Sequence, residues 1–134
     1  LDNDTSGCIL KLSSVRGFSP ASRCFYSHAY AAAKSAIVGL SKSLAAYYAQ
    51  HNIRINVLAP SLVLTPMSQR AQGNEDIMQY VQTKQPLDGG RIGHPEDITQ
   101  LACYLLSDHS RFTTGQVISV DGGWQVSEGQ WRKE

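Results

Sequence analysis

Two side chains with complementary acid–base chemistry lie four positions apart, in the stretch Tyr30-Ala31-Ala32-Ala33-Lys34. Residues i and i+4 of an α-helix share one face, so the phenol and the ammonium would project in nearly the same direction. The three alanines favour a helix and leave room for a ligand to approach. A fixed cation stabilises a phenolate, which helps a phenol to exchange a proton near neutral pH. The pair is a candidate acid–base group, although a core aromatic residue beside a solvated charge has the same spacing.

The composition is that of an ordinary globular protein without a strong bias of charge. The chain has 134 residues, of which 42% are hydrophobic and 17% are charged, and its formal net charge is +1. This length suits one domain. The small net charge gives no electrostatic case for nucleic acid or an anionic membrane as a partner, and no apolar run reaches the ~18 residues needed to span a bilayer. The cysteines share no metal-ligand spacing, so we expect reduced thiols in a cytoplasmic protein and no metal site. They are Cys8, Cys24 and Cys103.

Hydrophobic periodicity predicts strands and helices that alternate along the chain. Short apolar runs predict strands at residues 8–12, 53–59 and 116–120. Apolar residues at helical spacing predict a helix from about His28 to Gln50. Asn52 follows this helix and suits the left-handed conformation in which a chain can leave a helix.

The chain between the second and third strands contains a long irregular segment and a further helix. Residues 61–84 are mixed in character, with a short helical candidate at 75–83. A connection of this length inside a compact domain is usually functional, so we expect a lid over a substrate. The further helix has a clear start, because Pro95 is followed by two acidic residues in the first turn. Residues 125–134 form a polar tail.

Alternation of strands and helices predicts an α/β fold in which parallel strands are joined by right-handed helical crossovers. Three strands make a small sheet, and the strand at residues 8–12 would form one of its edges. This strand is apolar and would have nothing beside it, which is a poor place to end a sheet. The pattern therefore indicates part of a larger sheet.

Five segments, taken together and in this order, resemble the C-terminal half of a short-chain dehydrogenase/reductase. The likeness extends over nearly the whole chain. It implies the C-terminal part of a doubly wound, parallel, Rossmann-like fold, with about three parallel strands and flanking helices and with the N-terminal half absent. The segments are Ile9–Ser14, Tyr30–Lys34, Asn52–Pro60, Arg91–Ile98 and Thr114–Gly123.

The resemblance implies three catalytic residues. Enzymes of this family use a serine, a tyrosine and a lysine, which here would be Ser14 (with Ser13 as the alternative), Tyr30 and Lys34. The serine would hydrogen-bond the substrate oxygen and hold it against the tyrosine. Tyr30 would donate a proton to a carbonyl or remove one from an alcohol. Lys34 would favour that proton transfer and hydrogen-bond the nicotinamide ribose.

The resemblance also implies NAD or NADP as the cofactor. Pro60, Ser61, Val63 and Thr65 fall where the family has a Pro-Gly-x-Val-x-Thr pattern, which contacts the nicotinamide. With Tyr30 and Lys34, they are the candidate cofactor-binding residues. Ser61 replaces the usual glycine, so the backbone there has less freedom. The substrate would be a secondary alcohol or a ketone, and 3-oxoacyl thioesters, sugars or polyols, and small ketones all remain open.

The sequence departs from the family pattern in two ways. The loop between Ser14 and Tyr30 is longer than usual, and would either shape the substrate pocket or change which serine is used. The residues that give this loop its character are Arg23, Cys24, Phe25 and Tyr26. In addition, no Gly-rich turn for the pyrophosphate and no counterpart of the family's catalytic asparagine occur in these 134 residues. We therefore expect the N-terminal half to be a missing partner. The alternative is an inactive fragment that serves as an assembly module or as half of a two-chain enzyme.

The predicted helix at residues 28–50 carries more apolar residues than one core face can absorb. We expect Ala33, Ile37, Leu40, Leu44 and Tyr47 to form its core stripe. The additional apolar residues are Ala32, Ala36, Val38, Leu40, Ala45 and Tyr48. Apolar residues around most of a helix indicate burial on a second side, so we expect a homodimer or homotetramer with two-fold contacts between equivalent helices.

Overall fold

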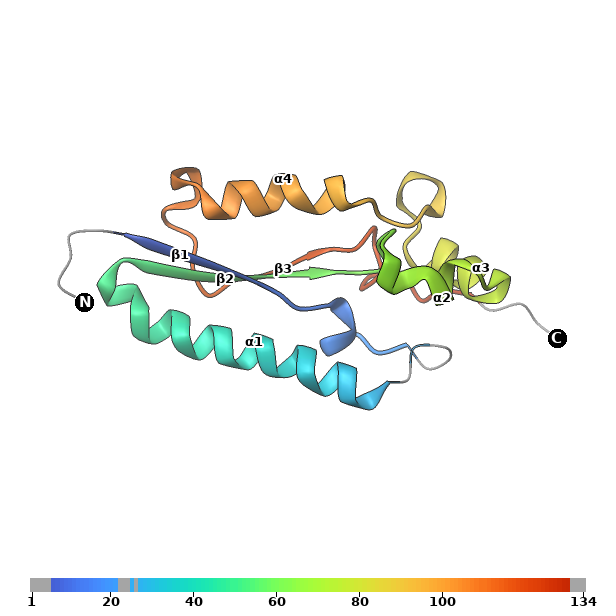
Figure 1. Ribbon diagram of the computed structural model, residues 1–134, viewed down its shortest axis with the longest axis horizontal. Coiled ribbons are helices and arrows are strands. Elements are labelled where there is room, and N and C mark those ends of the chain that lie inside the picture. Colours follow the sequence, from blue (N-terminus) through green and yellow to red (C-terminus); the bar gives the residue numbers. More distant parts are fainter. Residues whose placement is uncertain (1–5, 22–24, 26, 131–134) are drawn as a thin grey trace.

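The computed structural model describes residues 6–21, 25 and 27–130. In this part of the chain, three parallel strands form one sheet in the order β1-β2-β3. The helix α1 covers one face of the sheet and α4 covers the other, whereas α2 and α3 lie beyond the carboxyl ends of the strands (Figure 1). The strands are β1 (Gly7–Leu12), β2 (Ile53–Pro60) and β3 (Val117–Val120), and the α-helices are α1 (His28–Tyr48), α2 (Gln69–Gln72), α3 (Glu75–Lys84) and α4 (Pro95–Leu106). The predicted α/β fold with parallel strands is confirmed.

Short 3-10 helices connect the main elements. The predicted end of the first helix is confirmed closely, because α1 is followed by one 3-10 turn and then by Asn52, whose φ of 56° is left-handed. None of the described helices is long and apolar enough to cross a membrane. The 3-10 helices are η1 (Val15–Gly17), η2 (Ala49–His51), η3 (Pro66–Ser68), η4 (Leu87–Gly90) and η5 (Asp108–Ser110).

The central strand β2 is buried along most of its length, although its sequence alternates apolar and polar residues. Its polar side chains are hydrogen-bonded inside the protein. Arg54 Nη1 donates to the Leu105 carbonyl at 2.8 Å, and Asn56 Nδ2 donates to the Thr113 carbonyl at 2.9 Å. Asn56 Oδ1 accepts from the Gln116 amide at 3.1 Å. The alternating polar residues of β2 therefore form hydrogen bonds to the end of α4 and to the turn before β3. They do not form a solvent-exposed face of the sheet.

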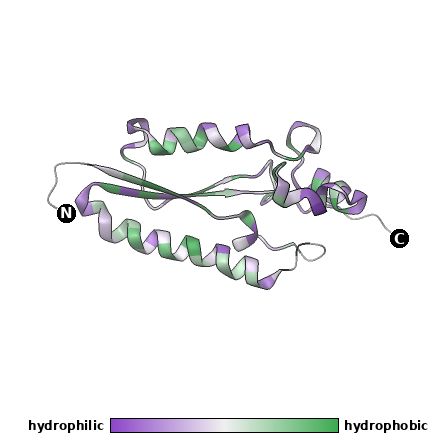
Figure 2. Ribbon diagram, viewed as in Figure 1, coloured by the Kyte–Doolittle hydropathy of each residue, from purple (hydrophilic) through white to green (hydrophobic). Residues whose placement is uncertain are grey.

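The core stripe predicted for α1 is wrong in part. The fully buried residues of the helix are Ser41 and Ala45, whereas Leu40 and Tyr47 are 53% and 62% exposed. Ser41 Oγ donates to the Ile37 carbonyl at 2.6 Å, which satisfies the buried hydroxyl. Small side chains on this face let α1 pack closely on the sheet. Hydrophobic residues thus remain on the outside of α1, as Figure 2 illustrates.

The strand β1 lies at the edge of the described sheet, as predicted. Each of its residues pairs with β2, from Gly7 opposite Ile53 to Leu12 opposite Leu58. Ile9 is 43% exposed and Leu12 is 57% exposed. This edge therefore presents apolar side chains next to unpaired backbone groups, a surface that ordinarily pairs with a further strand.

A hydrophobic cluster lies at the carboxyl end of the sheet and holds α3 in place. Trp124 is buried and contacts Phe25 and Tyr80 edge-to-face, with ring centroids 5.8 and 6.1 Å apart. The described part of the tail lies along α3, because the Gln130 amide donates to Thr83 Oγ1 at 2.6 Å. The remaining buried members of the cluster are Val15, Ala21, Ala59, Ala71, Ile77 and Val81.

The start of α4 is tied to the preceding loop by a pair of charged side chains. Asp97 Oδ2 accepts from the His94 amide at 2.7 Å, and both Asp97 oxygens accept from the Arg91 guanidinium at 2.7 and 3.1 Å. Arg91 Nε also donates to Asp88 at 2.6 Å. The hydrogen bonds from Arg91 hold the pKa of Asp97 well below its ordinary value. Because the pKa is lowered on folding, ionised Asp97 stabilises the folded state.

We predict that Asp97→Asn lowers the melting temperature at pH 7, and that the difference from the wild type shrinks as the pH falls below about 4. The contribution of a lowered carboxyl pKa is complete above the unfolded value and is lost as the pH falls through the folded value. Thermal melting from pH 7 to pH 2 measures this. Glu96→Gln is the matched control, since it removes the same charge from the same helical turn. An equal loss in both variants at pH 7 would argue against the Arg91–Asp97 pair as the cause.

Candidate active site

The carboxyl ends of the three strands bring distant parts of the chain to one edge of the sheet. Ser13 follows β1 and its amide donates to the Leu58 carbonyl at 2.8 Å. Ser61 follows β2 and its amide donates to the Val120 carbonyl of β3 at 3.4 Å. Ligands of open α/β sheets ordinarily bind outside this edge. The segments that carry the predicted site residues therefore meet where a ligand is expected.

The two candidate serines are both buried, but their hydroxyls make different bonds. Ser13 Oγ donates to the Lys34 carbonyl in α1 at 2.7 Å. Ser14 Oγ accepts from the Arg16 amide at 3.3 Å and donates to the Pro60 carbonyl in a long bond of 3.4 Å. Ser13 thus fastens β1 to α1, whereas the long Ser14 bond is one that a ligand oxygen could replace. Of the two hydroxyls, that of Ser14 therefore makes the weaker bond within the protein.

Tyr30 and Lys34 lie in the first two turns of α1, where both side chains are half-buried. Ser27 caps the helix, since its Oγ accepts from the Tyr30 amide at 3.4 Å. Lys34 Nζ donates to the Leu12 carbonyl at the end of β1, at 3.2 Å, and lies 5.6 Å from the centroid of the Tyr30 ring. The structure therefore brings the predicted ammonium and phenol together on one face of the helix.

Gly17 sets the distance between the segment after β1 and the helix α1. A Cβ atom at this position would lie 3.0 Å from the Lys34 carbonyl carbon and 3.0 Å from the Ser35 amide nitrogen. Ser35 Oγ also donates to the Gly17 carbonyl. A side chain at this position would push the two backbones apart by a few tenths of an ångström, so glycine suits this close approach. Gly17 thereby holds η1 against the turn of α1 that carries Lys34.

The loop after β2 is anchored at several points. Val63 forms an isolated parallel bridge with Gly93. Ser68 Oγ donates to the Val63 carbonyl at 2.6 Å and accepts from the Thr65 amide at 3.1 Å. The predicted cofactor-contacting residues after Pro60 thus belong to a loop of defined conformation.

Gln85 also holds this loop, and the sequence analysis missed it. Its side chain is only 2% exposed. Gln85 Oε1 accepts from the Leu62 amide at 3.3 Å, and Nε2 donates to the Leu62 carbonyl at 3.4 Å and to the Arg91 carbonyl at 2.9 Å. No motif marks Gln85, because a glutamine at the end of a helix is ordinarily exposed.

Arg16 is a second residue that the sequence analysis missed. Its guanidinium carbon lies 4.8 Å from the centroid of the Tyr30 ring and 5.3 Å from that of Phe25, and Nη2 donates to the Phe25 carbonyl. Burial lowers the pKa of Arg16, the phenolate form of Tyr30 would raise it, and the charge of Arg70 lowers it. The other residues expected to give the preceding loop its character, Arg23, Cys24 and Tyr26, lie outside the described residues.

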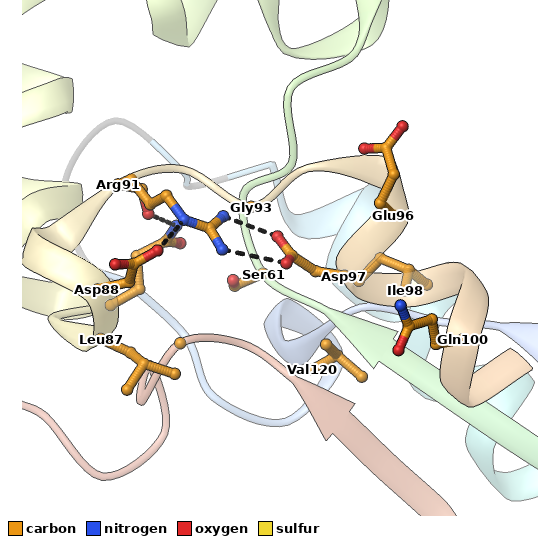
Figure 3. A pocket seen from close by; sticks show the side chains of 12 residues that line it. Ser61, Leu87, Asp88, Arg91, Gly93, Glu96, Asp97, Ile98, Gln100 and Val120 are labelled. Carbon is orange, nitrogen blue, oxygen red and sulfur yellow. Dashed lines mark hydrogen bonds and ion pairs between the residues drawn. The ribbon is translucent and has the colours of Figure 1, made fainter.

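A cavity of about 390 Å³ lies between the ends of β2 and β3 and the start of α4 (Figure 3). Of the predicted site residues, Ser61 lines it and Ser14, Tyr30 and Lys34 do not. Figure 3 shows the Arg91 guanidinium between Asp88 and Asp97, with which it forms two ion pairs, and Glu96 adds a third carboxylate to the lining. The described residues contain no group of three or more histidine, cysteine or acidic side chains placed to hold a metal ion. The cluster around Tyr30, with its cationic side chains, is the better candidate active site.

Comparisons with known proteins identify the family to which the chain belongs. Residues 2–125 match the family model for enoyl-(acyl carrier protein) reductase. The chain is 43% identical over 100 residues to 2-keto-3-deoxy-L-fuconate dehydrogenase of Xanthomonas campestris pv. campestris, an alignment that covers 71% of this chain and 33% of the relative. It is 41% identical over 120 residues to 3-oxoacyl-(acyl-carrier-protein) reductase of Chlamydia trachomatis, with 88% and 45% covered.

A solved structure has a similar fold. The complex of 4-hydroxyisoleucine dehydrogenase with NADH superposes with a TM-score of 0.82 at 33% identity, covering 92% of this chain and 49% of that chain. The chain therefore belongs to the short-chain dehydrogenase/reductase family. It spans about a third to a half of the length of these relatives.

We predict that Gln85→Leu lowers the free energy of unfolding by ~1–3 kcal/mol, because it removes the hydrogen-bond partner of the Leu62 amide and of the Arg91 carbonyl. Urea denaturation of the variant and the wild type measures the change. Gln69→Leu is the matched control, since Gln69 is exposed on α2. If Gln85→Leu is no less stable than this control, Gln85 does not anchor the loop.

Proposed function

We propose that the intact enzyme transfers hydride between NAD or NADP and a secondary alcohol or ketone, with Ser14, Tyr30 and Lys34 as its catalytic residues. The observation that carries this proposal is the position of the Lys34 ammonium, 5.6 Å from the Tyr30 ring at the carboxyl edge of the sheet. Membership of the family and the dehydrogenases and reductases among the relatives support it. We place the reaction in the cytoplasm, where Cys8 and Cys103 would stay free thiols.

Each of the three residues has a distinct task. A nicotinamide cofactor would supply the hydride in the reducing direction and accept it in the oxidising direction. Tyr30 gives its phenolic proton to the substrate oxygen in reduction and takes the hydroxyl proton in oxidation. Ser14 donates a hydrogen bond to the same oxygen and keeps it beside the phenol. Lys34 stabilises the phenolate that proton donation leaves behind.

The donors at this edge suit the nicotinamide half of a dinucleotide. Lys34 Nζ donates one hydrogen bond to the Leu12 carbonyl. An ammonium group has three N–H donors, so further donors are available for ribose hydroxyls. The anchored loop would place Pro60, Ser61, Val63 and Thr65 near the carboxamide, whose amide and carbonyl groups need both donors and acceptors. Contacts to the pyrophosphate would come from the N-terminal half of the fold, which we propose to pair with the exposed edge of β1.

A second candidate function is that of an assembly module without activity, or of half of a two-chain enzyme. The exposed apolar edge of β1 favours this alternative, because it offers a place for another chain to add a strand. The two candidates differ in their response to substitution of Tyr30, since an inactive module has no turnover to lose.

We predict that Tyr30→Phe lowers kcat of the intact enzyme by ~10²–10⁴-fold while the cofactor still binds. The phenylalanine keeps the ring but has no proton to exchange. Steady-state kinetics gives the rate, and the quenching of protein fluorescence by NADH gives the affinity. Tyr47→Phe, on the outer side of α1, is the control and should retain full activity. Near-normal rates in Tyr30→Phe would contradict the catalytic assignment.

We also propose that the enzyme is a homodimer or homotetramer that uses the outer side of α1. Leu40 and Tyr47 are exposed there, together with the smaller Ala33 and Ala36. Val38 and Tyr48, which the sequence analysis placed among the surplus apolar residues, are half-buried instead. The proposed contact is therefore tested by substitutions at Leu40 and Tyr47.

We predict that Leu40→Glu or Tyr47→Glu splits the oligomer, because each places a charge in an apolar contact. Light scattering of the intact enzyme measures the mass of the particle. Lys42→Glu, which is exposed on another side of α1, should leave the assembly unchanged. A monomeric wild type would refute the proposed contact.

A further inference from the structure

Arg16 is held in a defined position next to the candidate catalytic residues. It lies two positions after Ser14, whose Oγ accepts from the Arg16 amide at 3.3 Å. The close approach of Gly17 to α1 fixes the same 3-10 turn against Lys34. The guanidinium lies against the Tyr30 and Phe25 rings, 4.8 and 5.3 Å from their centroids. The side chain thus reaches the phenol that would exchange protons with the substrate.

The charge of Arg16 has no counter-ion among the described residues. Both ion pairs found there belong to Arg91. The Arg16 guanidinium bonds one backbone carbonyl, that of Phe25, and its buried Nε has no acceptor within the described part of the chain. Arg16 is half-buried, so part of its guanidinium is removed from water, which is costly unless an anion or several acceptors replace that water. Phe25 replaces only a small part of that solvation.

The surroundings add positive charge to this position. Burial lowers the pKa of Arg16, and the charge of Arg70, on α2 of the proposed lid, lowers it by a smaller amount. Lys34 Nζ lies 5.6 Å from the same tyrosine ring. The site around Tyr30 therefore gathers cationic side chains from η1 and α1. An anionic group on the substrate would relieve this imbalance, whereas a neutral substrate would leave it in place.

We propose that Arg16 binds a carboxylate of the substrate, so that the enzyme acts on hydroxy acids and the corresponding oxo acids. This inference rests on the proposed function. A planar guanidinium matches the two oxygens of a carboxylate with parallel N–H donors. Because the guanidinium contacts the Tyr30 ring, the carboxylate lies within a few bonds of the reacting carbon. Arg16 is then a specificity-determining residue that selects acids over thioesters and neutral ketones.

The test compares acids with their neutral esters in the intact enzyme. The probes are 2-hydroxybutyrate, 3-hydroxybutyrate and 4-hydroxypentanoate and their methyl esters, oxidised with NAD or NADP. We expect the wild type to prefer at least one acid over its ester. Arg16→Met should lower kcat/KM for that acid by ~10–100-fold, mainly through KM, and should change the rates with esters little. Arg16→Lys should restore part of the loss, because it keeps the charge but not the planar donors.

The matched control is Arg111→Met, which removes an exposed arginine from the turn before β3 and should change neither class of substrate. A wild type that prefers the esters, or an Arg16→Met variant that loses activity equally on acids and esters, would overturn the inference. The second of these results would indicate a structural role. Tyr30→Phe separates the two proposals, since it should remove turnover of acids and esters alike. If it does not, the proposed function fails.

A measurement without turnover covers the case in which no probe is oxidised. In the presence of NADH, propionate and malonate should raise the melting temperature of the wild type, whereas propionamide and malonamide should not. The rise should disappear in Arg16→Met and persist in Arg111→Met. An equal rise with amides, an equal rise in Arg16→Met, or no rise in the wild type would each overturn the assignment of Arg16 to a carboxylate.

Discussion

The candidate active site depends on a reciprocal pair of hydrogen bonds between β1 and α1. Ser13 Oγ donates to the Lys34 carbonyl at 2.7 Å, and Lys34 Nζ donates to the Leu12 carbonyl at 3.2 Å. Gly17 lets the backbone after β1 approach α1 closely enough for both bonds to form. The end of the strand and the helix thus hold each other in register. The positions of Ser14, Tyr30 and Arg16 all follow from this junction.

The central strand β2 organises the rest of the carboxyl edge. Its polar side chains Arg54 and Asn56 bond the segments that end α4 and lead into β3. Gln85 holds the loop after β2 in the same way, because its buried side chain forms hydrogen bonds to the backbone of Leu62 and Arg91. Buried polar groups are stable only when they are hydrogen-bonded, so each of these residues requires one arrangement of the neighbouring loops.

The contrast between two arginines separates the supporting structure from the candidate binding site. Arg91 is exposed and bonds Asp88 and Asp97, which keep its charge neutralised and its pKa above the ordinary value. Arg16 is half-buried against Tyr30, bonds one described carbonyl, and has its pKa lowered by burial. The first arrangement connects a loop to a helix. The second leaves a positive charge beside a group capable of acid–base chemistry, as binding sites for anions do.

The sequence by itself determined the order and type of the main elements. The strands β1, β2 and β3, the left-handed Asn52 after α1 and the start of α4 follow from local periodicity, helix capping and turn preference. The spacing of Tyr30 and Lys34 was enough to place both on one helical face, because a helix has a fixed number of residues per turn.

Only the tertiary structure decided which side of α1 meets the sheet and which further residues surround Tyr30. Ser41 and Ala45 replace larger apolar residues on the buried face, since close packing favours small side chains there. Gln85 and Arg16 act on residues that are distant in the sequence or separated from them by an irregular loop. No periodic pattern and no local motif in the sequence indicates such contacts. They arise only when the strands bring separate segments to the same edge of the sheet.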